Sequence, residues 1–224
     1  MSGHGPTLGT RELMGPGAAR VRFDYLTRRR SFGELRQLAV ATAKGHPRSS
    51  LVDEAMWRAF PRGYVGAWID DRLRGAIQLW PLDVRRAGDF LLGAREESAL
   101  TADDFAVVCN GPNTVWYFSG FLVDPEWRGR GLAAHLFAEA MVRWQRDLPW
   151  RTPVQFAALG ASEEGLRFIE GFGMTCVRPG GETADGFPLY ARTFESESAM
   201  REVVASAREA ADRKGRLAEA DEAG

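Results

Sequence analysis

Hydrophobic residues follow two kinds of spacing along this chain. Short runs that are apolar throughout, or at every second position, are typical of strands, and Val115–Val123 is the most strand-like of them. Stripes at three- and four-residue spacing are typical of amphipathic helices. Together they predict strands over residues 21–26, 64–69, 73–80, 115–123, 153–159, 174–178 and 187–194, and helices over about 31–45, 50–60, 131–146, 162–171 and beyond 195.

Polar residues mark where the first two helices should begin. Ser31 with Glu34 has the spacing of a capping box ahead of the first apolar stripe. Ser50 with Asp53 repeats this start signal, and Pro61 ends the second stripe. Two helices are therefore expected between the first and second strands.

The helix predicted over residues 131–146 has one apolar stripe and one polar face. His135, Glu139 and Arg143 follow one another at four-residue spacing on the polar face. We expect that face to be exposed to solvent, so His135 is predicted to be a surface residue and not a catalytic one. The apolar stripe consists of Leu132, Leu136, Phe137, Ala140, Met141 and Trp144.

Strands 64–69 and 73–80 are joined by a short segment with Asp70-Asp71, which is the arrangement of an antiparallel hairpin. The connection that follows, residues 82–113, is much longer than a tight turn. Connections of this length usually have a function or contain structure of their own.

Glycine and proline divide the chain into three parts. They are too dense in residues 1–20 for a regular element, so a flexible leader is expected there. A compact domain is expected over residues 21–194 and a C-terminal helical tail over residues 195–224. The tail could dock on the domain, pair with a second copy in a homodimer, or fray.

Composition narrows the classes of protein that remain. The 224 residues are 45% hydrophobic and carry a formal net charge of -1, so a single core is expected and no positive field favours nucleic acid. No apolar run is long enough for a signal peptide or a bilayer span, so we expect a cytoplasmic protein without membrane contact. Cys109 and Cys176 lack the spacing of metal or redox pairs, so we expect both to be buried and no metal to be bound.

A Gly-x-Gly turn follows the strand that ends at Val123 and precedes the helix at 131–146. The first amides of a helix have no internal partners and lie at the positive end of its dipole. Gly129 and Gly131 would let a diphosphate approach this backbone without a Cβ in the way. The turn therefore predicts an anion-binding site.

In this context the turn resembles the acetyl-CoA signature of the GNAT acyltransferase superfamily, Arg or Gln-x-x-Gly-x-Gly or Ala, matched by Arg128, Gly131 and Ala133. Val123-x-Pro125 also fits that family, and the segment from Arg167 to Met174 resembles its next helix, so the resemblance covers roughly residues 64–194. It implies an α/β (α+β) fold: a mixed, mostly antiparallel central sheet with a splayed pair of strands at 115–123 and 153–159, helices on both faces, and here an extra C-terminal helix.

The resemblance also implies the parts of an acyl-CoA site. The strand backbone at its end would pair with the pantetheine arm, the turn would hold the pyrophosphate, and the later helix would approach the cofactor arm. The residues implied for cofactor binding are Phe121, Leu122, Val123, Arg128, Gly129, Arg130, Gly131, Leu132, Ala133, Ser162 and Phe168.

The chemistry implied is attack by a neutral amine on a thioester. Such a reaction needs an amide that polarises the carbonyl, for which the backbone near Val123 is the candidate, and a route for the amine proton. Tyr117 and Ser119 are the catalytic candidates on the strand, although Tyr117 could instead pack or line the acceptor pocket. Ile169 stands where the family often has a Tyr that protonates the departing thiolate, so a substitute donor is expected.

The function expected is transfer of an acyl group, most often acetyl, from acetyl-CoA or another acyl-CoA to the amine of a small molecule. A protein or peptide acceptor and a non-catalytic acyl-CoA-binding regulatory module are the alternatives. Residues 82–113 are expected either to border the acceptor site or to form a surface excursion or subunit contact.

Overall fold

The computed structural model describes residues 10–13, 19–42, 53–107, 111–148, 150 and 152–222. Within them the strands are β1 Thr10–Leu13, β2 Ala19–Tyr25, β3 Tyr64–Ile69, β4 Arg72–Asp83, β5 Thr114–Val123, β6 Val154–Leu159, β7 Thr175–Arg178 and β8 Leu189–Phe194. The α-helices are α1 Arg29–Thr42, α2 Glu54–Ala59, α3 Gly88–Leu91, α4 Leu132–Asp147, α5 Glu163–Gly171 and α6 Glu197–Glu222. Strand β1 lies in the segment expected to be a leader.

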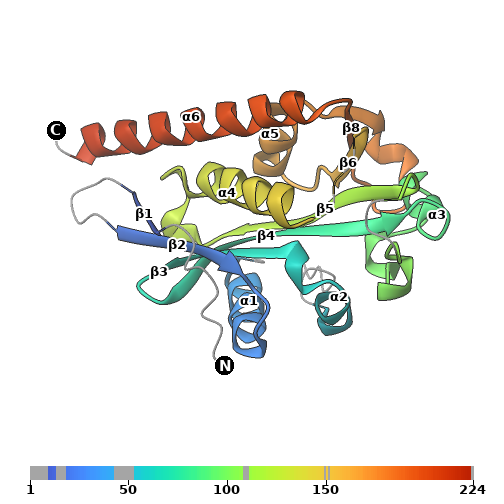
Figure 1. Cartoon of the computed structure of the whole chain (residues 1–224), viewed down its shortest axis with the longest axis horizontal. Helices are drawn as coiled ribbons and strands as arrows, with labels where there is room; N and C mark the ends of the chain where they lie inside the picture. Colours follow the sequence, from blue (N-terminus) through green and yellow to red (C-terminus); the bar gives the residue numbers. More distant parts are fainter. Residues whose placement is uncertain are drawn as a thin grey trace.

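All strands belong to one sheet in the order β1-β2-β3-β4-β5-β6-β8-β7. Every neighbouring pair is antiparallel except β5 with β6, which are parallel. Helices α4, α5 and α6 lie on one face of the sheet, and α1 and α2 lie on the other (Figure 1). Helix α3 packs through Phe90 into the same apolar cluster as α1 and α2. The mixed, mostly antiparallel sheet with helices on both faces is confirmed.

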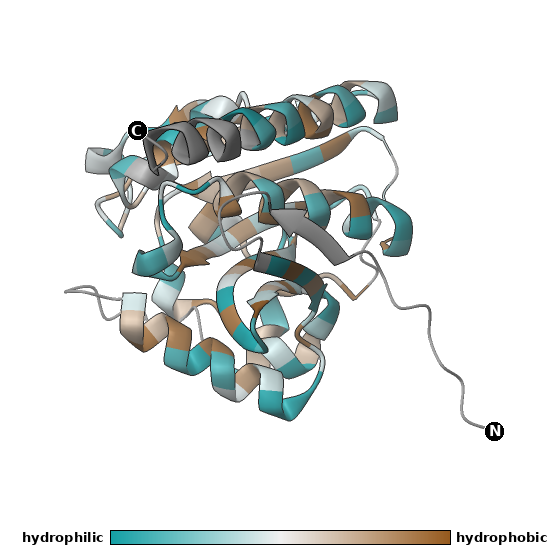
Figure 2. Cartoon of the chain, turned by 90° about the vertical axis from the view of Figure 1, so that its left-hand side faces the viewer, coloured by the Kyte–Doolittle hydropathy of each residue, from teal (hydrophilic) through white to brown (hydrophobic). Residues whose placement is uncertain are grey.

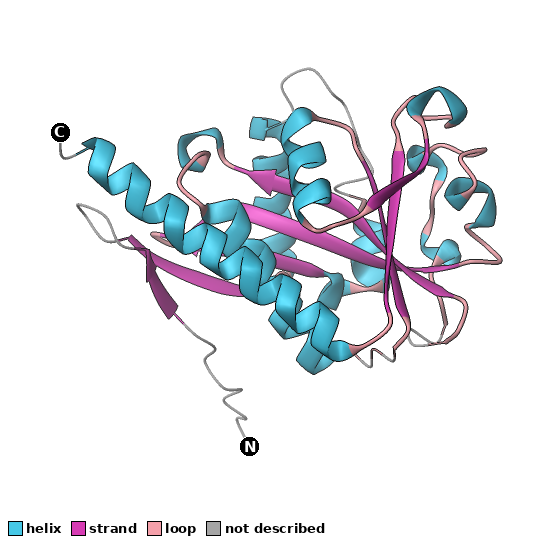
Figure 3. Cartoon of the chain, turned by 90° about the horizontal axis from the view of Figure 1, so that it is seen from above, coloured by secondary structure: helices cyan, strands magenta, loops and turns pink. Residues whose placement is uncertain are grey.

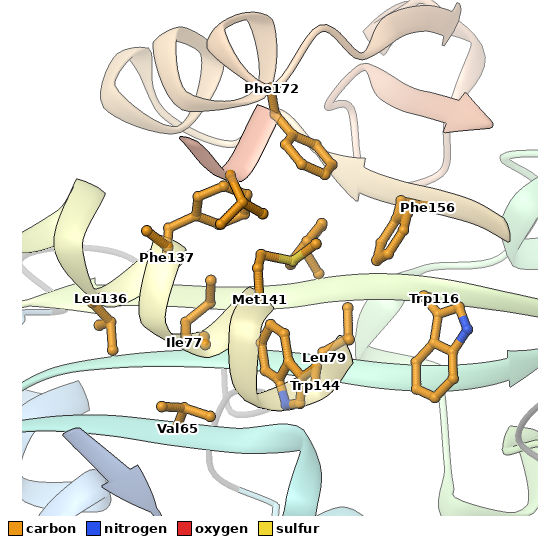
Figure 4. Packing of buried hydrophobic residues seen from close by; sticks show 14 of the residues in the cluster. Val65, Ile77, Leu79, Trp116, Leu136, Phe137, Met141, Trp144, Phe156 and Phe172 are labelled. Carbon is orange, nitrogen blue, oxygen red and sulfur yellow. The ribbon is translucent and has the colours of Figure 1, made fainter. Parts of the chain in front are cut away.

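The larger part of the core lies between the sheet and α4. Phe137, Met141 and Trp144 point from α4 toward the strands, where Ile77 and Leu79 of β4 face them (Figure 4). These side chains are at most 2% exposed, as the apolar stripe predicted. A second cluster, built around Trp80, Phe90 and Tyr117 among others, fills the opposite face under α1, α2 and α3.

The helix starts differ in detail from the prediction. Helix α1 begins at Arg29, so Ser31 lies inside its first turn and is buried, and the capping-box prediction was wrong. The side chain of Asp53 caps α2 by accepting the amides of Ala55 and Met56, whereas Ser50 lies outside the described residues. Hydrophilic and hydrophobic residues alternate along α1 (Figure 2), and Phe32, Leu35 and Leu38 are buried, whereas Val40 is 81% exposed.

The polar face of α4 is covered by α6, which contradicts the exposed surface expected there. His135 and Arg143 are each 3% exposed. Arg208 of α6 binds Glu139 at 2.8 Å, and Nε2 of His135 lies 3.7 Å from the carboxylate of Asp212. The expectation failed at His135 and Glu139 because α6 packs beside them, whereas Arg143 donates to the carbonyl of Phe23 in β2 at 2.7 Å. Figure 3 shows α6 lying across the top of the domain.

The connection between β4 and β5 is folded. It contains α3 and two short 3-10 helices, η3 (Glu97–Ala99) and η4 (Ala102–Asp104). Phe90, Leu100 and Phe105 anchor it in the second core cluster. Outside it, Cys176 is exposed on β7, an edge strand, so the expectation that it is buried was wrong, and Cys109 lies outside the described residues.

Candidate functional site

Strands β5 and β6 separate part-way along their length. Their parallel pairing runs from Val115–Gln155 to Phe118–Ala158 and ends there. On the other side, β5 stays paired with β4 up to Val123, with a bulge that leaves Ser119 without an opposite residue in β4. From Ser119 onward, one backbone edge of β5 therefore faces the gap between the strands.

Backbone direction decides which peptide groups face this gap. The N–H of Asp124 donates to the carbonyl of Arg74 at 2.8 Å, so it points toward β4. The peptide groups of successive residues in a strand point to opposite sides. Leu122, two residues before Asp124, therefore also directs its N–H and carbonyl toward β4. Phe121 and Val123 direct theirs away from β4, into the gap. Nε of Arg128 donates to the Val123 carbonyl at 3.2 Å, which agrees with this direction.

An ion pair holds the start of the turn after β5. Arg74 binds the carboxylate of Asp124 at 2.6 Å and that of Glu126 at 3.3 Å. The Asp124 carboxylate also accepts the N–H of Glu126 at 3.0 Å and so caps the short 3-10 helix η5 (Pro125–Trp127). Burial raises the pKa of Asp124, but the hydrogen bonds from Arg74 and Glu126 outweigh it and leave that pKa below its ordinary value.

The turn itself needs its two glycines. Gly129 and Gly131 have φ of +77° and +79°, in the left-handed region that other residues rarely adopt. Gly131 is the N-cap of α4, so the free amides at the start of that helix lie next to it. Arg128 and Arg130 are exposed on either side of Gly129, and the guanidinium of Arg130 lies 5.5 Å from the ring centre of Trp127. The first amides of α4 and the exposed guanidinium groups of Arg128 and Arg130 thus lie at the positive end of α4, where an anion would be stabilised.

The other residues expected at the cofactor fall into two groups. Phe168 of α5 contacts Phe121 edge-to-face, with ring centres 4.9 Å apart, and so joins α5 to the free part of β5. Ser162 caps α5 by accepting the amide of Gly165 at 3.1 Å. Leu132 is fully buried in the core, so only its backbone can contribute to the turn, while Ala133 is half-buried.

The two catalytic candidates are buried beside the gap. Tyr117 is 1% exposed on the face of the sheet opposite to α4, and its hydroxyl donates to the carboxylate of Glu97 at 2.8 Å. Ser119 is 7% exposed, and its hydroxyl lies 3.4 Å from the amide oxygen of Gln78. Ile169 is 3% exposed within the core. Sequence reasoning missed Glu97 and Gln78, since no local pattern pointed to either.

Among the described residues, no helix is long and apolar enough to cross a membrane. No three of their His, Cys, Asp or Glu side chains come together as a metal site would require.

The sequence model of the Acetyltransferase (GNAT) family matches residues 30–148, more than half of the chain. The chain therefore belongs to the GNAT acetyltransferase family. This family makes acyl transfer from an acyl-CoA the expected activity, and the matched segment includes the turn at Gly129 and Gly131. No curated protein sequence matches the chain.

Solved structures of this fold resemble the chain at low sequence identity. The loading GNATL domain of CurA from Lyngbya majuscula is 15% identical with a TM-score of 0.57, over 77% of this chain and 97% of that one. PH1933 from Pyrococcus horikoshii OT3 is 12% identical with a TM-score of 0.53, over 79% of this chain and 99% of that one. An agmatine N-acetyltransferase is 14% identical with a TM-score of 0.51, over 78% and 100% of the two chains. These likenesses show the fold.

Proposed function

We propose that this protein is an N-acyltransferase that moves an acyl group, most often acetyl, from acyl-CoA to the amine of a small molecule. The observation that carries the proposal is the juxtaposition of two backbone features. Phe121 and Val123 direct their peptide groups into the gap after β5, and the left-handed Gly131 opens α4 directly beyond it.

The donor would lie along this path. The pantetheine arm carries amides that can pair with the peptide groups of Phe121 and Val123 in the manner of an added strand. The pyrophosphate would bind the amides of residues 129–133, and Arg128 and Arg130 would add charge-assisted contacts. The amide of Val123 would polarise the thioester carbonyl. Arg128 would then exchange its bond with the Val123 carbonyl for one with phosphate.

The acceptor would approach from the face that carries α1, α2 and the connection, because α4, α5 and α6 cover the other face. That connection is tied to the loop between β7 and β8. The N–H of Ala184 donates to the carbonyl of Gly93 at 2.7 Å, and the N–H of Glu97 donates to the carboxylate of Asp185 at 2.9 Å. Two joined segments on this face favour an enclosed, small acceptor over a polypeptide.

Calorimetry with acetyl-CoA, followed by a thiol-release assay over a panel of small amines and lysine-containing peptides, tests the proposal. Binding with turnover of a small amine is expected. Binding without any turnover would favour the regulatory module, and turnover of peptides alone would favour a protein acceptor. Absence of acyl-CoA binding would refute both the site and the function.

A further inference from the structure

Tyr117 of β5 and Glu97 of the connection form a buried, hydrogen-bonded pair. Glu97 opens η3 in the connection, is 2% exposed, and accepts the hydroxyl of Tyr117 at 2.8 Å. Its own N–H is held by Asp185 from the loop between β7 and β8. Three segments far apart in sequence thus fix one carboxylate against one phenol.

The position of this pair relates it to the gap. Tyr117 pairs with Ala157 of β6 one step before the parallel pairing ends. It precedes Ser119 at the bulge by two residues, which is roughly 7 Å along a strand. Its side chain lies on the face from which we expect the acceptor, in the cluster that contains Phe90 and Trp80. Glu97 is a carboxylate that accepts a hydrogen bond from a side chain of β5.

We propose that Glu97 and Tyr117 form the route by which the amine loses its proton, an inference that rests on the acyltransferase function proposed above. Tyr117 is the catalytic residue that would meet the amine, and Glu97 is a positioning residue that acts through it. A phenol alone, with an ordinary pKa of ~10, is a poor base near neutrality. A phenol that is donating its proton to a carboxylate can accept a second proton from nitrogen.

The amine nitrogen forms a bond to the thioester carbonyl carbon, and the carbon–sulfur bond breaks with its electron pair leaving on sulfur. The proton on nitrogen passes to the Tyr117 oxygen as the Tyr117 proton passes to Glu97. The carboxylic acid then returns its proton through Tyr117 to the thiolate or to solvent. The products are the amide and CoA, and Glu97 ends as it began.

Because the apolar residues of the connection fold it onto the sheet, its Glu97 is buried beside Tyr117. A carboxylate is costly to bury unless it is hydrogen-bonded, and Tyr117 supplies one such bond. The connection brings this group to β5 from outside the strand, which itself has no carboxylate between Thr114 and Val123.

The test compares Glu97→Gln and Tyr117→Phe with Glu96→Gln, an exposed neighbour that serves as the matched control. We expect kcat to fall ~10²- to 10⁴-fold in the first two variants, with unchanged affinity for acetyl-CoA and with kcat of the control unchanged. The loss of kcat in these variants should become smaller as the pH rises, because hydroxide can take the amine proton instead. A purely structural role would lower the amount of folded enzyme equally at every pH.

The activities of the two variants decide whether Glu97 and Tyr117 carry the amine proton. Folded Glu97→Gln with kcat within about threefold of the wild type overturns it, given the ~10²-fold minimum expected of a lost proton acceptor. If Glu97→Gln does not fold, Tyr117→Phe decides, since it keeps the ring packing and removes only the hydroxyl, and full activity there overturns the relay. A wild-type protein that binds acetyl-CoA but acylates no amine refutes the acyltransferase proposal itself, whereas an active wild type with active variants refutes the relay alone.

Discussion

Gly131→Val is the sharpest perturbation of the proposed donor site. Gly131 has φ of +79° at the N-cap of α4, and a residue with a Cβ in the left-handed region costs about 1–2 kcal/mol. A branched residue either keeps that strain or relaxes to negative φ and turns the peptide away. In the first case the added methyl groups stand where the pyrophosphate should approach, and in the second the amides no longer converge on it.

The assay separates binding from folding. Gly186→Ala provides the control for backbone strain, because Gly186 has φ of +72° outside the turn and a Cβ there would meet nothing within 4 Å. Gly131→Ala and Gly186→Ala should each lose about 1–2 kcal/mol in urea unfolding. Only substitutions at Gly131 should weaken acetyl-CoA binding in calorimetry, by ~10-fold or more, which equals a loss of about 1.4 kcal/mol. A folded Gly131→Val protein with wild-type affinity would refute the placement of the pyrophosphate.

Arg74→Ala should weaken acetyl-CoA binding, because it removes the partner that holds Asp124 at the start of the turn; undiminished affinity in calorimetry would count against that role. The lowered pKa of Asp124 means that its contribution to stability is present above its unfolded pKa of ~3.9 and is lost as the pH falls through the lower folded value, so the urea midpoints of wild type and Asp124→Asn should converge in acid. Met200→Ala, at a 1% exposed position of α6, should cost about 2–5 kcal/mol in urea unfolding, and a smaller loss would show that α6 docks weakly. Ile169→Tyr should cost about 1–3 kcal/mol by overpacking the core without raising turnover, and a ~10²-fold gain in kcat would show that the natural site lacks an acid there.

The order of elements could be predicted because each depends on local spacing. The apolar stripe of α4 identified the face that packs on the sheet, and the strand pattern of 115–123 located β5 within one residue. The opposite face of α4 was assigned wrongly, since polar residues do not reveal whether a second helix covers them. Arg208 and Asp212 lie more than sixty residues beyond their partners Glu139 and His135, so no local pattern connects them.

The two ends of the candidate site differ in the same way. The donor end is made of consecutive backbone: the peptide groups of residues 121–123, the turn, and the first amides of α4. Gly129 and Gly131 indicate this backbone conformation in the sequence itself, because a left-handed φ favours glycine at both positions. The resemblance to the family and the geometry therefore point to one segment.

The proton-transfer end is made of side chains that the tertiary fold brings together. Tyr117 stands on a strand, Glu97 on an irregular connection, and Asp185 on a loop almost ninety residues after Glu97. A glutamate in a connection is ordinarily a solvated residue, so neither its type nor its spacing distinguishes it from Glu96 beside it. Only burial distinguishes Glu97 from Glu96, and burial is a property of the folded chain. Consequently a family signature can locate the donor site. The group that takes the amine proton can be found only from the fold, which shows which carboxylate lies against β5. In this chain that carboxylate is Glu97, and the comparison of Glu97→Gln with Glu96→Gln measures what its position contributes.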